Sequence, residues 1–170
     1  SDLHVLITGS FISMGELLDQ PGIEIIDSSN ITIMGTECSD NADGIRIINS
    51  TRIFFSSVSV HSNDVDLVVM DSSDIYLEDC YIAGSLYDGA LITRSNNVTF
   101  IGCRFYANCG AIQNDGSIHV LSSSLIFFID SEIVMTGGHG LLIENQPEGD
   151  RSSVIILEGS EISSCSSAIK

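Results

Sequence analysis

Short bursts of apolar residues recur along this chain with a period of about 22 residues, and turn-forming residues separate them. The segment 22–43 (GIEIIDSSNITIMGTECSDNAD) is followed by 44–66 (GIRIINSTRIFFSSVSVHSNDVD), and 67–88 (LVVMDSSDIYLEDCYIAGSLYD) continues the pattern. Each repeat holds three bursts rich in Ile, Val, Thr, Phe and Ser. This pattern predicts a solenoid built from strands, because helical repeats are longer, at about 33–47 residues, and need helices of about ten residues.

The second and third bursts of each repeat alternate apolar and polar residues, which predicts that every other side chain points inward. Between these bursts lies a Gly, Ser or Asp, residue types that tolerate a left-handed backbone and allow a sharp bend. Stacked parallel strands of one repeat close into a coil, and the crossover rule gives its hand. The sequence therefore predicts an all-β fold, a right-handed single-stranded parallel β-helix with about six full coils and three short strands per coil. The expected inward column of the second strand is Ile31, Ile53, Ile75, Val98, Ile126 and Ile155.

The repeats predict a single β-helix domain over 1–170 with uncapped ends. Both ends fall within a turn and no amphipathic helix covers the core, so we expect a fragment of a longer β-helix or a subunit whose ends a partner covers. Two turns are longer than the rest, and we expect their extra residues at 114–125 and 144–154, as neighbouring loops at one corner. Full turns are expected to begin near Gly22, Gly44, Asp66, Asp88, Cys109 and His139.

The charge balance narrows the classes of function. Six Lys and Arg against 23 Asp and Glu give a formal net charge of −17, which repels nucleic acid and anionic membrane surfaces. No apolar run approaches the roughly 18 residues of a membrane span, so we expect no membrane insertion and no nucleic-acid partner. The acidity suits an extracellular, cell-surface or virion-associated protein. Five Cys without a CxxC pair predict neither a zinc site nor a disulfide framework, although Cys80 and Cys103 share a column in which buried thiols or a disulfide would fit.

Several outward columns also carry apolar side chains, among them Ile48 and Val68 in the first strand and Phe54 and Tyr76 in the second. Apolar residues on both faces of a strand indicate that both faces are covered. These faces either pack against other protein, including a second copy of the chain, or present aromatic rings as a platform for sugars.

Four aspartates recur at one corner of the repeat, between the third strand and the first strand of the next turn. Because Asp43, Asp64, Asp66 and Asp88 fall there on successive turns, we expect neighbours about 5 Å apart and the outermost pair about 10 Å apart. Carboxylates roughly 6.5–9.5 Å apart suit inverting glycoside hydrolysis, and crowding two carboxylates raises the pKa of one of them. His61 is placed to assist proton transfer. Two other interpretations remain open: a calcium site at Asp43, Asp64 and Asp66, or solvated turn residues selected for backbone conformation.

The segment 41–69 (NADGIRIINSTRIFFSSVSVHSNDVDLVV) resembles the active-site turns of polygalacturonases, which are β-helical glycoside hydrolases of the pectin-lyase-like kind. The motifs of that family run Asn-Thr-Asp-Gly, then Asp-Asp about one turn later, then Gly-His-Gly. By this resemblance Asp43 matches the Asp of the first motif and Asp64 the first Asp of the pair. Val65 stands at the second Asp, and LYDG (86–89) stands at the Gly-His-Gly position. The resemblance implies a β-helix that cleaves a polysaccharide with acidic residues.

Two functional hypotheses follow. The first is a carbohydrate-associated β-helix, a glycoside hydrolase or polysaccharide lyase acting on a glycan at its acidic edge. Asp43, Asp64 and Asp88 would share the acid and base roles, and Asp66 and His61 would assist. The second is a non-catalytic structural or adhesive β-helix, such as a tailspike, stalk, fibre or surface protein, that self-associates through its apolar faces. Neither needs a cofactor, and calcium is the one ion that the acidic corner predicts.

Overall fold

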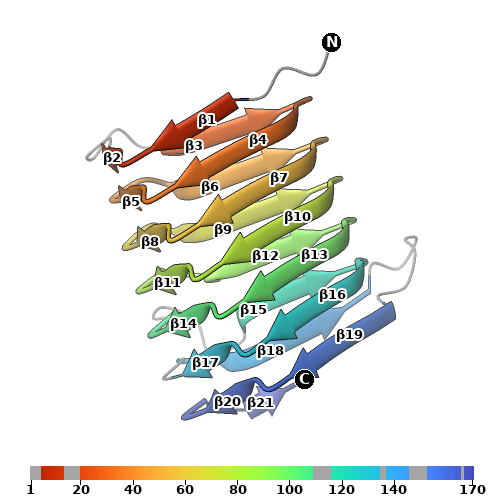
Figure 1. The fold of residues 1–170 in the computed structure, drawn as a ribbon. Helices are drawn as coiled ribbons and strands as arrows, with labels where there is room; N and C mark the ends of the chain where they lie inside the picture. The colour runs from red at the N-terminus through yellow and green to blue at the C-terminus, as the bar shows by residue number, and fades with distance from the viewer. Residues whose placement is uncertain (1–4, 14–19, 109–115, 135–136, 146–152, 166) are drawn as a thin grey trace.

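The computed structural model of this chain describes residues 5–13, 20–108, 116–134, 137–145, 153–165 and 167–170. In these ranges every regular element is a strand, and the strands form three parallel sheets of seven strands each. The chain passes through the first sheet (sheet C), then the second (sheet A), then the third (sheet B), and then enters the next coil (Figure 1). The prediction of a right-handed parallel β-helix with three short strands per coil is confirmed.

The strands stack in chain order within each sheet, so each coil contributes one strand to each face. Sheet C consists of β3 (Ile23–Ile26), β6 (Asp43–Ile48), β9 (Val65–Met70), β12 (Ala90–Thr93), β15 (Gly116–Leu121), β18 (His139–Glu144) and β21 (Ser167–Ile169). Sheet A consists of β1 (Val5–Thr8), β4 (Ser29–Met34), β7 (Thr51–Ser56), β10 (Ser73–Glu78), β13 (Asn96–Ile101), β16 (Ser124–Ile129) and β19 (Ser153–Glu158). Sheet B consists of β2 (Phe11–Ser13), β5 (Glu37–Ser39), β8 (Ser59–His61), β11 (Tyr81–Ala83), β14 (Arg104–Tyr106), β17 (Glu132–Val134) and β20 (Glu161–Ser163).

The core is the set of inward columns that the period-2 pattern predicts. In sheet A, Ile31 pairs with Ile53 and the same column continues through every later coil. Near the middle, Phe100 and Phe128 stack with ring centroids 5.0 Å apart, and Phe105 packs edge-on at 5.3 Å from Phe100. Fully burying one such ring stabilises the fold by about 1.5–3 kcal/mol. This continuous apolar core holds the outer faces in fixed positions.

Hydrogen-bonded columns of small polar residues close the corners. Between sheets C and A, the backbone N–H of one serine donates to the Oγ of the serine one coil later, at 3.1 Å for Ser50 to Ser72 and 3.2 Å for Ser72 to Ser95. These serines are buried, so the ladder satisfies amides that would otherwise lack a partner. Between sheets A and B, the predicted bend residues do have positive φ; they are Gly35, Ser57, Asp79, Gly102, Asp130 and Gly159.

The register of sheet C differs from the sequence-based expectation after the third coil. Residues 114–125 were expected as an expanded corner, but Gly116–Leu121 is strand β15, with Ile118 and Val120 in the core. The extra residues of that coil fall earlier, between the end of β14 and the start of β15. The two longer connections therefore lie at different corners. A separate, smaller change precedes these connections: one additional residue between β11 and β12 moves Ala90 and Ile92 to inward positions that were expected to face outward.

Candidate functional site

The outer face of sheet C carries the first group of charged side chains. Asp43 begins β6 and is half-buried beside Arg46, whose Nε lies 2.7 Å from its Oδ2. The same guanidinium reaches Glu24 on the preceding coil, with Nη1 3.3 Å from Oε1. Charge-assisted bonds of this kind hold a carboxylate in one orientation. Asp43 is thus an oriented, solvent-accessible carboxylate.

A second group lies further along the same face. Asp88, 7% exposed, precedes β12, and its Oδ1 accepts a hydrogen bond from the backbone N–H of Gly116 at 3.0 Å. Its Oδ2 lies 3.5 Å from Nδ1 of His119 in β15, and Nε2 of that imidazole lies 3.1 Å from Oε2 of Glu144 in β18. The hydrogen bond from His119 to Asp88 raises the pKa of the imidazole, with a smaller contribution from Glu144, although partial burial opposes both. The protonated form of His119 is therefore favoured.

Sequence reasoning missed His119 because residues 114–125 were expected to be a loop. The signal that could have placed it is the alternation in Ile118-His119-Val120, in which two buried apolar residues flank an outward one. Glu144 is the last residue of β18, which pairs directly with β15, so the same strand assignment also places Glu144 near His119. The acid–base pair on this face thus includes a histidine that the aspartate pattern did not predict.

Strand register sets the spacing between the two groups. Asp43 pairs with Val65, and Asp88 lies at the equivalent position one coil further on. At the spacing of neighbouring strands, the backbones of Asp43 and Asp88 are about 10 Å apart. His139 occupies the same column two coils beyond Asp88, and its ring nitrogens are buried without a hydrogen-bond partner among the described residues. The outer face of sheet C therefore offers a carboxylate and a protonated imidazole on either side of an apolar strip around Val68.

Asp66 lies in the interior instead. It is 0% exposed, and its Oδ1 accepts hydrogen bonds from the side chain of Asn63 at 2.8 Å and from the backbone N–H of Asn63 at 3.4 Å. Its Oδ2 has no partner among the described residues. Burial raises the pKa of Asp66 to about 8, against the opposing effect of the Asn63 hydrogen bonds. A substrate on the surface cannot reach this carboxyl group.

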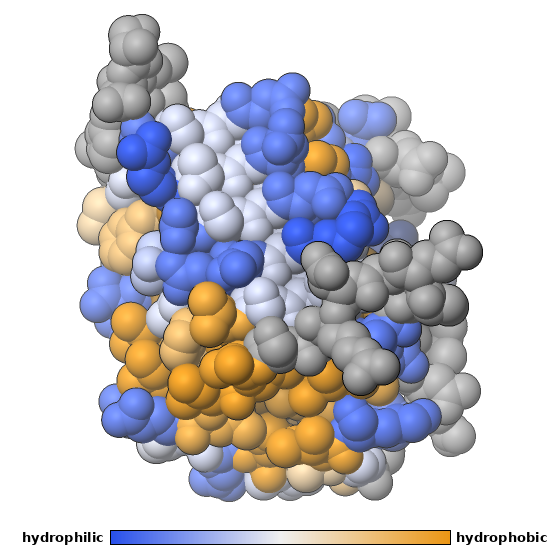
Figure 2. Space-filling view, turned by 90° about the vertical axis from the view of Figure 1, so that its right-hand side faces the viewer, coloured by the Kyte–Doolittle hydropathy of each residue, from blue (hydrophilic) through white to orange (hydrophobic). Residues whose placement is uncertain are grey.

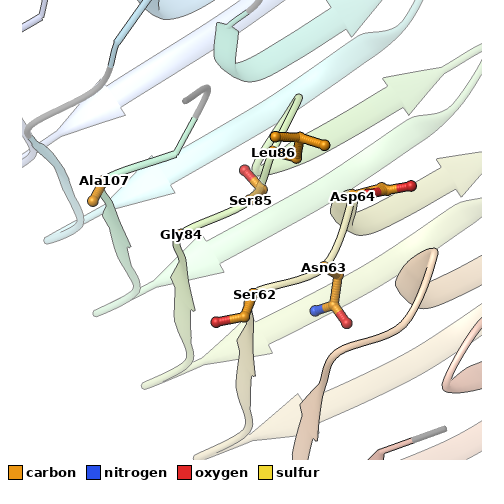
Figure 3. A pocket seen from close by; sticks show the side chains of 7 residues that line it. All are labelled: Ser62, Asn63, Asp64, Gly84, Ser85, Leu86 and Ala107. Atoms are coloured by element: carbon orange, nitrogen blue, oxygen red, sulfur yellow. The ribbon is translucent and has the colours of Figure 1, made fainter. Parts of the chain in front are cut away.

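Asp64 lies at the corner between sheets B and C, and His61 is the last residue of β8, just before that corner. Asp64 is exposed and lines a hollow of about 490 Å³ with Ser62, Gly84 and Leu86 (Figure 3). His61 is on the outer face of sheet B, where Nε2 lies 3.0 Å from Oε1 of Glu37. The five expected site residues therefore occupy three different surroundings: the sheet C face, the interior, and the sheet B corner.

The calcium hypothesis needs Asp43, Asp64 and Asp66 to share one ion. Asp43 is paired with Arg46 on the sheet C face, Asp64 is exposed at the corner and Asp66 is enclosed, so the three carboxylates do not fit a common ligand shell. Among the ranges that the structure describes, no group of three or more His, Cys, Asp or Glu side chains comes together in a way that could hold a metal. Nor is any helix in those ranges long and apolar enough to cross a membrane.

The three parallel sheets, the single-stranded coil and the left-handed corner residues define a right-handed parallel β-helix. The chain belongs to the family described as right handed beta helix region, whose model matches residues 4–117 and, in an overlapping match, 68–170. Comparison with curated proteins gives no match.

Solved structures with the same fold include a bacteriophage tailspike protein and two epimerases. Full-length tailspike protein 2 of the Escherichia coli O157:H7 bacteriophage CAB120 aligns over 80% of this chain and 19% of its own, with a TM-score of 0.62 and 14% identity. A mutant of the periplasmic alginate epimerase AlgG aligns over 88% of this chain and 46% of its own, with a TM-score of 0.58 and 15% identity. The mannuronan C-5 epimerase A-module of Azotobacter vinelandii aligns over 98% and 55%, with a TM-score of 0.52 and 14% identity. The chain thus spans between a fifth and about half of these proteins, and at this identity the likeness is one of fold.

Proposed function

We propose that this protein cleaves a polysaccharide on the outer face of sheet C, with His119 as the proton donor. The observation that carries the proposal is the His119 imidazole held between Asp88 and Glu144, with its side chain 17% exposed. The fold likeness to a tailspike and to two epimerases that act on alginate or mannuronan, as their names state, supports a carbohydrate role.

The reaction is hydrolysis of a glycosidic bond. Nε2 of protonated His119 exchanges its hydrogen bond to Glu144 for one to the glycosidic oxygen, and it gives that oxygen a proton as the bond to the anomeric carbon breaks. A water molecule attacks the anomeric carbon and releases its proton to the solvent. Asp88 orients the imidazole and favours its charged form, in the same way that carboxylates hold catalytic histidines elsewhere. Asp43 lies on β6, three coils from β15, so its backbone is about 14 Å or more from that of His119. This distance exceeds the roughly 6.5–9.5 Å of an inverting pair, and Asp43 is therefore assigned to glycan binding.

The remaining expected residues take smaller parts in this proposal. Asp64 lies at the neighbouring corner, where it is accessible to a bound glycan. Asp66 is enclosed and His61 faces Glu37 on another sheet, so neither is assigned a role in proton transfer. The net charge of −17 favours neutral over polyanionic substrates.

Release of reducing ends from a panel of neutral and acidic polysaccharides tests this function. We expect turnover on a neutral substrate, a loss of about 100-fold or more in kcat/KM for His119→Gln and Asp88→Asn, and a raised KM for Asp43→Asn. Asp130→Asn, at the exposed bend between sheets A and B, is the matched control and should keep full activity. Folded protein that turns over no member of the panel would contradict the proposal.

The second candidate is a structural or adhesive role without chemistry, and exposed apolar side chains on the outside of the solenoid favour it. Leu125 and Val154 occupy one column at the start of β16 and β19, Ile156 is outward in β19, and the three are 38–53% exposed. Figure 2 shows apolar side chains gathered over the lower part of the molecule. Self-association through this surface would remove it from water. Sedimentation should then show oligomers that Ile156→Glu dissociates, and a monomer at all concentrations would count against self-association.

Both candidates predict a location outside the cytoplasm. Two of the similar structures are of a bacteriophage tailspike and a periplasmic enzyme, by their descriptions, and the acidity of this chain is compatible with an extracellular, cell-surface or virion-associated setting. Fractionation of the producing cell or particle, followed by immunodetection, checks this expectation.

A further inference from the structure

A groove crosses three successive coils along the outer side of sheet B. Its floor at the corner consists of Ser62, Gly84 and Ala107, which directly follow β8, β11 and β14 (Figure 3). All three have a left-handed backbone, with φ of 60°, 71° and 52°. A left-handed backbone costs an L-residue such as alanine about 1–2 kcal/mol, because alanine has no polar side chain to form the local hydrogen bond by which Asn or Asp offsets this cost. Small side chains on three coils in a row keep this corner hollow.

Two adjoining hollows share these floor residues and form one groove. The hollow toward sheet C has a volume of about 490 Å³, and the hollow over sheet B has a volume of about 440 Å³. Both volumes lie within the usual range for small-molecule sites, roughly 300–1,000 Å³. Both hollows are shallow and open to solvent, and together they cross three coils, which suits an extended chain lying along the surface rather than an enclosed small molecule.

Aromatic rings and an imidazole form the walls over sheet B. Ala83 pairs with His61 on one side and with Tyr106 on the other, so these two larger side chains flank a small one. At the spacing of neighbouring strands they are about 10 Å apart, which leaves a notch between them. Tyr81, 38% exposed, stands on the same strand as Ala83 and borders the notch.

Neighbouring charged groups hold these walls in place. The guanidinium of Arg104 lies 5.2 Å from the ring centroid of Tyr106, a cation–π contact that braces the ring. His61 is held by Glu37 through Nε2 at 3.0 Å, and its Nδ1 lies 3.2 Å from Oγ of Ser62. A braced ring and a braced imidazole lose little conformational entropy when a ligand binds.

We propose that this groove is a binding site for a neutral oligosaccharide, separate from the sheet C face. Tyr81 and Tyr106 would pack against the C–H faces of pyranose rings, and the hydroxyls of Ser59 and Ser62 would bond sugar hydroxyls. Among the described residues that line the two hollows, Asp64 is the one carboxylate and none is Lys or Arg. Together with the net charge of −17, this lining favours neutral glycans over uronic-acid polymers. The rise of about 4.8 Å per coil is close to the length of one pyranose, so the notch spans about two sugar units.

Methyl NMR of protein labelled at alanine tests the site directly. The probes are neutral hexasaccharides of glucose, mannose, galactose and N-acetylglucosamine, with hexagalacturonate as the anionic comparison. We expect one neutral probe to shift the methyl signals of Ala83 and Ala107 saturably, while the signal of Ala90, which is fully buried in sheet C, stays constant. Because binding is measured, His119→Gln should leave it unchanged, which separates this site from the proposed chemistry.

Variants with matched exposure give the decisive comparison. Tyr81→Ala should weaken binding by roughly tenfold and Tyr81→Phe should retain it, because stacking needs the ring and not the hydroxyl. Tyr76→Ala, on the outer face of sheet A and 37% exposed, should have no effect. The proposal is overturned if no neutral probe shifts Ala83 and Ala107, if hexagalacturonate binds equally well, or if Tyr76→Ala weakens binding as much as Tyr81→Ala. It is also overturned if Tyr81→Ala abolishes self-association and leaves glycan binding intact, since a second copy of the chain would then occupy the groove.

Discussion

The buried carboxyl group of Asp66 should make the stability of this protein fall as pH rises from about 4 to 8. Burial raises its pKa from 3.8 to about 8 in the folded state. Between these two values the unfolded chain has lost the proton and the folded chain retains it, so the unfolded state binds fewer protons and the free energy of unfolding decreases with pH. One pKa unit corresponds to about 1.4 kcal/mol, so a shift of about four units removes roughly 5 kcal/mol across this interval.

Asp66→Asn should abolish this contribution. The amide keeps an oxygen that accepts from Asn63, and its NH₂ takes the place of Oδ2, which has no partner among the described residues. A protonated carboxyl group leaves the same position unsatisfied, at a cost of about 1–3 kcal/mol in either protein. The two proteins should therefore be about equally stable at pH 4, and the variant should be more stable by several kcal/mol at pH 8.

Urea unfolding followed by far-UV circular dichroism at pH 4, 6 and 8 measures the difference. At each pH, the free energy of unfolding of the native protein minus that of the variant gives the contribution of Asp66, because the other titrating groups are common to both proteins. Asp64→Asn, two residues away and exposed, is the control and should give curves parallel to those of the native protein. If the stabilities of the native protein and Asp66→Asn have the same pH dependence, then Asp66 does not retain its proton in the folded state and the reasoning from burial is wrong.

Three further predictions concern the ladder, a corner glycine and the histidine. Ser95→Ala removes the acceptor of the Ser72 amide and a donor to the carbonyl of Thr93, so we expect a loss of about 1–3 kcal/mol, measured by urea unfolding against an exposed Ser→Ala control. Gly89→Ala would place a Cβ 2.6 Å from the carbonyl oxygen of Ser117, so we expect a lower thermal midpoint, equivalent to about 2 kcal/mol or more, and a normal midpoint would show that the corner can shift. The NMR titration of His119 should give a pKa above the ordinary value of about 6.5, which Asp88→Asn returns toward that value, and an unchanged titration would remove Asp88 as the cause.

The columns of sheets A and B were predictable because each apolar burst there keeps a constant length from coil to coil. Ile53 and Ile75, for example, are 22 residues apart, and their register is the one observed. Sheet C was predictable only as far as β9. One extra residue between Ala83 and Ala90 then shifts the frame. The segment Gly84–Asp88 (GSLYD) differs in composition from the preceding corner Ser62–Asp64 (SND), but its composition does not say how many of its residues belong to the corner.

The acidic corner shows why a strand pattern cannot assign an active site by itself. Asp64 and Asp66 are two residues apart and were expected to act together, yet one is exposed and the other has no accessible surface. The chain bends between them, so the period of two that holds within a strand does not hold across the corner. The groups that the fold does bring together, Asp88 and His119, are 31 residues apart in a sequence whose period is about 22, so a search at the repeat spacing passes over them.

A β-helix separates the requirements of folding from those of recognition more completely than most folds do. Each coil contributes one residue to each outward column, so a side chain such as Tyr81 can change with no effect on the inward position of Ile82 beside it. Outer columns are therefore free to vary from coil to coil, and on sheet B the observed succession of a histidine, an alanine and a tyrosine produces a notch within an otherwise regular surface. Asp64 lies at the corner that joins this notch to sheet C, and a glycan seated on the tyrosines that continued past Asp64 would reach the face that holds Asp88 and His119. The proposed binding groove and the proposed acid–base pair thus lie on neighbouring faces of the solenoid, with the corner that holds Asp64 between them.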